Sequence, residues 1–161
     1  MPPSSTPVEY RIVRDLQSAI AAIAAGATYW NTVASTSVKL DPNHQVEEFI
    51  APGGARPLVV IQVMPERWRY DPANQVHMVI PMTLHWFQAS DVLVDESRDE
   101  VFFKACADLE TSLMADGSRG GLAVDTRIVR RTLDDGVDSK DIWAMVEVEV
   151  ALYRTYGQPN G

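Results

Sequence analysis

The sequence predicts an α+β fold, in which two helices pack on one face of a single, mainly antiparallel β-sheet in the order α-β-β-β-α-β-β. Two segments, residues 7–25 and 96–116, repeat apolar side chains at helical spacing. Other segments are apolar throughout or alternate apolar with polar side chains, as strands do. Short stretches rich in Pro, Gly, Asn and Asp separate them, which favours hairpin connections. With 161 residues the chain can bury one core, so we predict a single domain at residues 7–156 between flexible ends at 1–6 and 157–161.

The first helix is expected to begin after Thr6, which can serve as the N-cap. Pro7 fits the first helical position, and Glu9 completes a capping box. The apolar residues that follow fall on one stripe: Ile12, Leu16, Ile20 and Ile23. An Ala-rich stretch favours helix as far as Ala25, and Gly26 is suited to end it.

Three strands are expected in the middle of the chain. Strand-forming residues predict the first near residues 32–40, and residues 46–50 form either a short strand or a turn. Residues 58–64 are apolar on both faces, which is typical of a central strand. Residues 65–74 contain Pro, Arg, Trp and Tyr and are expected to be a loop that projects from the sheet.

The third of these strands is long and is predicted at residues 75–87. One of its faces carries only apolar side chains, those of Val76, Met78, Ile80, Met82, Leu84 and Trp86. Pro81, in the middle of the strand, has no amide hydrogen to donate to a neighbouring strand. We therefore expect this strand to lie at an edge of the sheet or to be bulged at Pro81.

The C-terminal part of the chain predicts a helix followed by two strands. The helix carries an apolar stripe made of Phe102, Ala105, Leu109 and Leu113, and a Gly-rich turn at residues 117–121 ends it. Strands are expected at residues 122–131 and 142–153, joined by an acidic turn. In the last strand valines alternate with Glu147 and Glu149, so the carboxylates should lie on the face opposite the valines.

Composition argues against several classes of function. The chain has 14 Lys and Arg against 22 Asp and Glu, a net charge of −8, whereas nucleic-acid binding needs clustered cations. Cys106 is the only cysteine, so the fold does not depend on an internal disulfide. The opening residues, MPPSSTPVEY, lack the pattern of a secretory signal. No apolar run reaches the roughly 18 residues of a membrane helix, so we expect no membrane contact.

Residues capable of catalysis are present, but they form no recognised pattern. His44, His77 and His85 lack metal-ligand spacing, and Cys106 lies beside an apolar helical stripe, where a small core residue is expected. The carboxylates between residues 134 and 141 have the composition of a turn, and nothing selects an acid–base pair among them. We therefore expect no catalytic residue, no cofactor and no metal.

The most unusual local cluster is Arg67-Trp68-Arg69-Tyr70. Trp, Tyr and Arg are enriched at the cores of protein–protein contacts, which makes this cluster a candidate subunit or partner interface. Interleaved aromatic and Arg side chains can also stack on single-stranded nucleic acid. In a third interpretation the cluster is a solvated loop whose Trp68 folds back onto the core.

The chain resembles the tail terminator proteins, also called tail completion or minor tail proteins, of long-tailed bacteriophages. One part of the resemblance is carried by the capped first helix, residues 11–16 (RIVRDL), and another by residues 57–61 (PLVVI) and the loop that follows. The third part is a C-terminal module that runs from residues 108–122 (DLETSLMADGSRGGL) to residues 146–155 (VEVEVALYRT). The likeness covers most of residues 7–156, through loose patterns rather than invariant motifs.

The resemblance implies a structural virion protein that assembles as a ring, usually a hexamer, at the head-proximal end of the tail. Such a ring caps the tail tube, stops its polymerisation and offers a surface for head–tail joining. The implied partners are further copies of this chain, the tail tube protein and the head–tail connector or neck protein, with assembly in the host cytoplasm. Genomic DNA would pass through the ring without specific binding, and an acidic lumen would repel it. Asp134, Asp135, Glu147 and Glu149 are the candidates for that lumen.

Two other interpretations stay open. The protein can be a neck or head-completion protein that lies between portal and tail, or a small-ligand-binding or enzymatic α+β domain. A terminator should limit the length of tail tubes, whereas a ligand-binding domain should not affect them.

Overall fold

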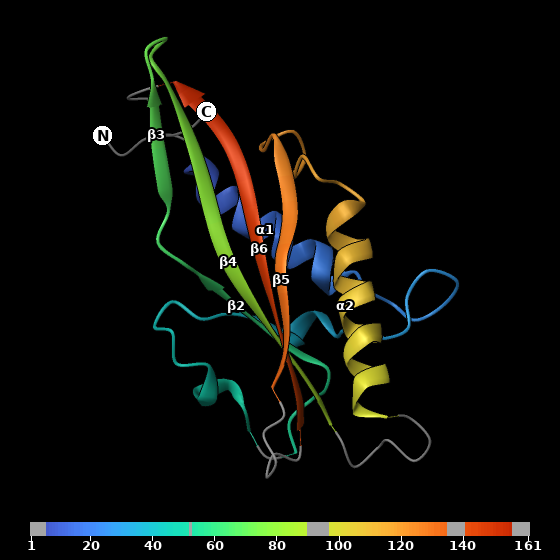
Figure 1. Ribbon diagram of the computed structural model, residues 1–161. Coiled ribbons are helices and arrows are strands. Elements are labelled where there is room, and N and C mark those ends of the chain that lie inside the picture. The colour runs from blue at the N-terminus through green and yellow to red at the C-terminus, as the bar shows by residue number, and fades with distance from the viewer. Residues whose placement is uncertain (1–5, 52, 90–96, 135–140, 156–161) are drawn as a thin grey trace.

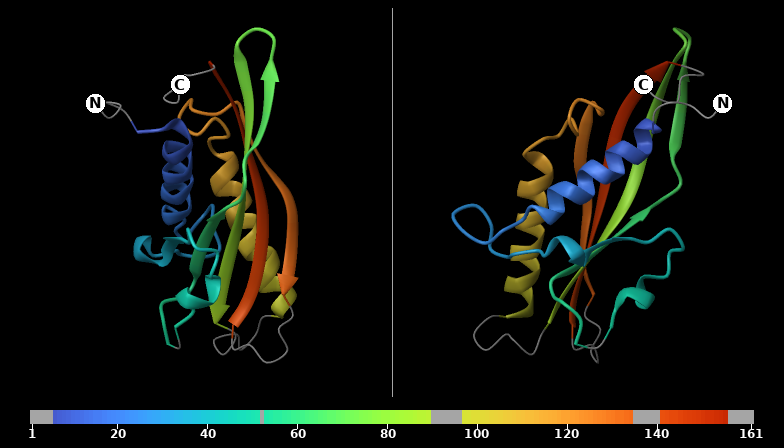
Figure 2. Two further views of the ribbon diagram at one scale, coloured as in Figure 1. Left: turned by 90° about the vertical axis from the view of Figure 1, so that its left-hand side faces the viewer. Right: turned by 180° about the vertical axis from the view of Figure 1, so that it is seen from behind.

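A computed structural model describes residues 6–51, 53–89, 97–134 and 141–155, which form a six-stranded sheet with two α-helices on one of its faces (Figures 1 and 2). The strand order is β1-β2-β4-β6-β5, and β3 pairs with the other half of the same edge of β4. β1 is parallel to β2, and the remaining pairs are antiparallel. This arrangement confirms the predicted α+β class, with one strand more than expected. The predicted flexible ends lie outside the described residues except for Thr6.

Helix α1 spans Val8–Ala21, so it starts one residue later and ends earlier than predicted. Pro7, not Thr6, is the N-cap residue, and no side chain caps the helix. The predicted capping box is therefore wrong, because Pro7 adopts an extended ψ of 141°. The Ala-rich stretch leaves the helix because the chain turns back there, where the Gly26 amide donates to the Tyr29 carbonyl. Helix propensity is a weak preference that such tertiary contacts override.

The segment after α1 contains much less strand than its composition suggests. β1 is Val38–Leu40, and a 3₁₀ turn, Ser35–Ser37, precedes it. The predicted strand over residues 32–40 is therefore wrong for its first part, where the Ser37 amide donates to the Ala34 carbonyl. Val46–Phe49 is a further 3₁₀ turn, which agrees with the turn alternative.

The central strand β2, Leu58–Val63, lies between β1 and β4 as predicted. β4, Gln75–Ala89, is longer than predicted and lies inside the sheet with β6 along one side. The prediction that Pro81 places β4 at an edge or in a bulge is wrong. Pairing with β2 ends at Met82 and pairing with β3 begins at Val79, so Pro81 lies where one neighbour replaces the other. Its carbonyl accepts from the Met64 amide there, at 2.8 Å, so the missing Pro81 donor faces this break and disrupts no strand pair.

The C-terminal elements lie close to their predicted positions. α2 is Arg98–Met114, β5 is Asp125–Asp134 and β6 is Asp141–Thr155. The Ser97 hydroxyl caps α2 by accepting from the Glu100 amide. The predicted apolar stripes of both helices and the apolar faces of β4 and β6 meet in the main core. In the view of Figure 1, α1 passes behind the sheet and α2 stands beside β5.

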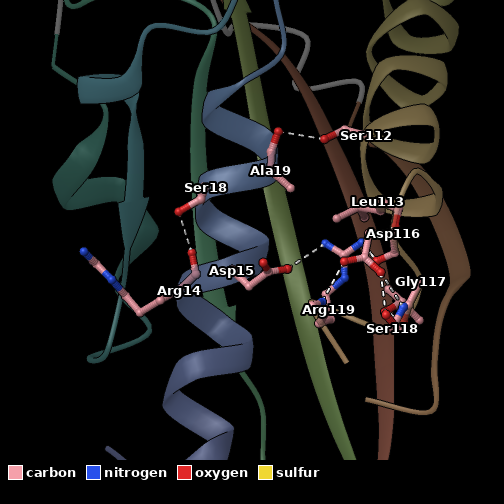
Figure 3. A network of polar contacts seen from close by, with 12 residues as sticks. Arg14, Asp15, Ser18, Ala19, Ser112, Leu113, Asp116, Gly117, Ser118 and Arg119 are labelled. Carbon is pink, nitrogen blue, oxygen red and sulfur yellow. Dashed lines mark hydrogen bonds and ion pairs between the residues drawn. The ribbon is translucent and has the colours of Figure 1, made fainter. Parts of the chain in front are cut away.

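A buried arginine joins the two helices at the turn after α2 (Figure 3). The guanidinium of Arg119, which is 1% exposed, donates to the carbonyls of Leu113 and Asp116 and lies 3.3 Å from the Asp15 carboxylate of α1. This arrangement confirms the Gly-rich segment as a helix exit and turn, because Arg119, Gly120 and Gly121 all have positive φ.

A smaller core covers part of the other sheet face. Val46 and the turn around it pack on Leu58, Val60 and Phe87, whose side chains point away from the helices. The remainder of this face, over β3, β5 and parts of β4 and β6, carries mostly polar side chains. We call this part the open face: Arg67, Arg69, His77, Thr83, Arg127, Arg130, Glu147, Glu149 and Tyr153.

Candidate functional site

The strongest sequence candidate, residues 67–70, lies on a strand and not in a loop. β3 is Arg67–Asp71, all of its residues are exposed, and it pairs antiparallel with β4. The loop prediction is wrong because Pro65 and Pro72 only bound the strand, and the tight turn is confined to the residues before β4, where Asn74 has a φ of 61°. The β3–β4 hairpin extends past the end of β5 (Figure 1), whereas β6 pairs with β4 as far as Gln75.

Pairing with β4 divides this cluster between two faces of the hairpin. Trp68 is opposite Met78, a residue of the main core, so Trp68 and Tyr70 lie on the helix-bearing side. Arg67 and Arg69 lie on the open face. A flat partner could not contact both pairs of side chains, whereas a partner that approaches the edge of β3 could contact one pair on each side.

Trp68 is exposed but fixed in position. The residue is 44% exposed, and its indole N–H donates to the Glu66 carboxylate at 3.0 Å. The Arg154 guanidinium lies 4.5 Å from the centre of the indole ring and is itself paired with Glu9 of α1. The Tyr70 ring lies 6.5 Å from that of Trp68. Trp68 is therefore held by Glu66 and Arg154 and stays 44% exposed, so it does not fold back onto the core as one interpretation expected.

Glu149 is the centre of an ion-pair group on the open face. It accepts hydrogen bonds from Arg127 of β5, at 2.8 Å, and from Arg67 of β3. The hydrogen bond from Arg127, followed by the charge of Arg67, lowers the pKa of Glu149 from its ordinary value despite partial burial. Glu147 is paired in the same way with Arg130, at 2.7 Å. At these positions three arginines pair with two glutamates, so the open face carries a slight excess of positive charge and is not a bare acidic surface.

Of the other two lumen candidates, only one lies within the described residues. Asp134 is the last residue of β5, opposite Trp143 in the register of β6. Asp135 lies outside the described residues. Whether these carboxylates face a lumen depends on an assembly of several copies, so their assignment stays a prediction.

The histidines and the cysteine have structural surroundings. His77 stacks on Tyr153, His44 bonds to the Val63 carbonyl, and His85 is buried in the second core. Burial raises the pKa of the Cys106 thiol to about 11, which makes it a poor nucleophile at neutral pH. Within the described residues no three His, Cys, Asp or Glu side chains gather into a group that could hold a metal ion. No described helix is long and apolar enough to cross a membrane.

An apolar groove of about 350 Å³ opens between the start of α1 and the break between β2 and β3. Its lining includes Tyr10, Val13, Ile61 and Ile80. The carboxylates near it are already engaged, since Glu9 pairs with Arg154 and Asp41 accepts from Gln62. The groove thus offers few free polar groups to orient a substrate.

Sequence reasoning missed a second exposed aromatic site, on the loop after α1. Trp30 is 64% exposed, and Phe103 of α2, which lines the same hollow, is 62% exposed. The loop is fixed by Asp108 of α2, a residue only 1% exposed, whose carboxylate accepts from the amides of Trp30 and Asn31 at 2.9 and 2.8 Å. The sequence signal was weak, because Asp108 lies far along the chain from the loop and appears in the sequence as an ordinary helical residue.

Comparisons with known proteins leave the family of the chain open. A scan against models of protein families finds no match, and a search of curated proteins finds no relative. The resemblance to tail terminator proteins therefore stays a prediction drawn from sequence patterns.

Proposed function

We propose that this protein is a structural component of a bacteriophage tail, in which several copies form a ring that caps the tail tube and stops its growth. The same ring offers a surface to the head–tail connector. The observation that carries the proposal is the β3–β4 hairpin, which presents exposed but fixed Trp and Arg side chains at an edge of the sheet. Side chains of these types contribute most of the binding energy at protein–protein contacts.

Two further features support an assembly role. Among the described strands β5 forms an edge of the sheet, 10 residues long, whose bulge at Val129 and exposed Arg127 and Arg130 hinder uncontrolled strand pairing. The candidate chemistry sites, in contrast, consist of a thiol of raised pKa, separated histidines and ion-paired carboxylates. A function based on surfaces accounts for this distribution better than a function based on a reaction.

The charge of the open face bears on how DNA would pass through such a ring. Glu147 and Glu149 pair with three arginines in total, so a lumen lined by the open face would be slightly positive at these positions and not acidic. Because an excess of cations favours DNA binding, the open face fits such a lumen less well than an acidic surface would.

Negative-stain electron microscopy of the protein alone, and after mixing with tail tube protein, tests the proposal. We expect rings at tube ends and shorter tubes as the ratio of this protein to tube protein rises. Tubes of unchanged length without caps would overturn the proposal. Binding to portal or connector proteins without binding to tubes would instead favour a neck protein.

Replacement of Trp68 and Tyr70 by Ala tests the hairpin directly. Loss of one anchored aromatic at a contact costs about 2 kcal/mol or more, so capping should be lost at concentrations where the wild type caps every tube. The matched control is Met114→Ala, which removes an apolar side chain of a residue that is 43% exposed on α2. Thermal unfolding must show that the double variant is folded. Full capping by a folded double variant would exclude the hairpin as the contact.

A further inference from the structure

Two exposed tryptophans of this protein are fixed in the same way. Arg154 lies over the ring of Trp68 at 4.5 Å, and Lys104 lies over the ring of Trp30 at 5.1 Å. In each case the cation is also paired with a carboxylate, Glu9 for Arg154 and Glu100 for Lys104. An aromatic ring held in this way loses little conformational entropy when a partner covers its free face, which favours binding.

The loop that carries Trp30 is held by a buried carboxylate, and burying a carboxylate costs free energy. Asp108 is 1% exposed and accepts from the backbone amides of Trp30 and Asn31 and from the Asn31 side-chain amide at 2.8 Å. A buried carboxylate is tolerated only when such donors satisfy it. Here the donors all belong to a surface loop, so the buried charge serves to position that loop and the indole it carries.

The fixed loop and α2 form a shallow hollow with an acidic border. Its lining includes Trp30, Phe103 and Ala107, with Asp99 and Glu100 beside them. Lys104 neutralises Glu100 at 3.0 Å. Asp99 is exposed and makes no ion pair with a described residue.

The β3–β4 hairpin has the complementary features. It carries the aromatic side chains Trp68 and Tyr70, 44% and 62% exposed, on one side. Arg69, on the other side, is exposed and makes no ion pair within the described part of the chain. The hairpin and the Trp30 loop lie on opposite sides of the molecule in both Figure 1 and the right-hand view of Figure 2.

We propose that the hollow between Trp30 and Phe103 receives the β3–β4 hairpin of a second copy of this chain. The hairpin would approach by the edge of β3, so that Trp68 and Tyr70 pack against the Trp30 and Phe103 rings on one side and Arg69 pairs with Asp99 on the other. Because the two surfaces differ and lie on opposite sides, each copy binds one neighbour by its hairpin and another by its hollow. Such a head-to-tail contact continues from copy to copy and closes into a ring when the rotation between neighbours allows it. The inference rests on the proposed function only for the identity of the resulting ring.

A charge exchange between the two surfaces tests the contact. Arg69→Asp and Asp99→Arg, each alone, should raise the dissociation constant of self-association about tenfold, because each places like charges face to face. The double variant should return to within about threefold of the wild type, since the pair is restored with reversed polarity. Arg14→Asp makes the same change at an exposed arginine of α1 and should have no effect. A double variant as weak as the single variants would overturn the Arg69–Asp99 pairing.

Cross-linking tests the geometry without changing any proposed anchor. Ala73 lies in the exposed turn of the hairpin and Ala107 in the hollow. With both replaced by Cys, a short bismaleimide should link folded copies into a ladder of trimers and larger species. Each single Cys variant can give dimers at most. Cys106 should stay unmodified, because it is buried and its thiol pKa is raised to about 11.

The outcomes separate this inference from the proposed function. A ladder together with capped tubes supports both, and a ladder without capped tubes retains the contact but overturns the tail function. Capped tubes without a ladder overturn the contact alone. A chain that neither self-associates nor caps tubes overturns both.

Discussion

The two faces of the sheet differ in the side chains they carry and in what those side chains contribute to stability. On the helix-bearing face β6 contributes Val146, Val148, Val150 and Leu152, each at most 1% exposed. On the open face the alternate residues Glu147 and Glu149 form ion pairs with arginines of the neighbouring strands. Burial of apolar area supplies most of the folding free energy, whereas exposed ion pairs contribute little. The comparison indicates that the covered face determines stability and leaves the open face and the hairpin free to serve contacts.

Adjacent residues of β4 provide the largest expected difference between the faces. Leu84 is 0% exposed in the main core, and its neighbour Thr83 is opposite Glu147 on the open face. Leu84→Ala should lower the free energy of unfolding by about 3 kcal/mol, from lost transfer energy and a residual cavity. Thr83→Ala should change it by less than about 1 kcal/mol. Urea unfolding measures both values, and similar values at the two positions would contradict the comparison.

Arg119 is an exception among the apolar residues of the covered face, because it is a buried cation between the helices. Arg119→Met would leave the carbonyls of Leu113 and Asp116 without this donor and the Asp15 carboxylate without its partner. The free energy of unfolding should fall by about 3 kcal/mol, slightly less than for a fully buried ion pair because Asp15 is partly exposed. Arg14→Met, at an exposed position of the same helix layer, is the matched control and should be nearly neutral. A stable Arg119→Met variant would show that packing alone joins α1 to α2.

The elements that could be predicted from the sequence are those with one apolar face or a continuous apolar run. β4, α2 and β6 have periodic burial and β2 is buried on both faces, and both patterns are local properties of the sequence. β3 was missed because all its residues are exposed and Pro65 and Pro72 beside it are typical of a loop, although its aromatic residues alternate with arginines. The length of β1 and the end of α1 depend on hydrogen bonds of the loop between them, which propensity does not encode.

The candidate site could be predicted only in part for a similar reason. Composition was enough to select Trp68 and Tyr70, but their separation from Arg67 and Arg69 follows from pairing with β4. The arginine partners of Glu149 come from two other strands, and Trp30 is held by a residue of α2. Such contacts join distant parts of the chain, so a single sequence by itself does not reveal them.

The smallest expected effect is the acid sensitivity that His85 gives to the second core. Trp143 donates its indole N–H to Nδ1 of His85 at 3.1 Å, so the ring proton is on Nε2, which donates to Gln62 at 2.9 Å. Protonation of His85 Nδ1 would place its N–H against the indole N–H of Trp143, so that two donors face each other. Burial lowers the pKa of His85 from its ordinary 6.5, opposed in part by the charges of Asp41 and Glu47.

This shift fixes the sign of the pH dependence. The unfolded chain binds a proton at His85 near pH 6.5 and the folded protein resists it, so the stability contribution is complete above pH 6.5 and declines as the pH falls below it. His85→Gln should flatten the dependence of the unfolding free energy between pH 7.5 and about 5. Glu149→Gln is the control from the open face, since its lowered pKa acts only below its ordinary 4.5 and should leave that interval unchanged. Urea unfolding at a series of pH values distinguishes the two variants. An unchanged slope in His85→Gln would mean that another group, and not the second core, causes the acid sensitivity.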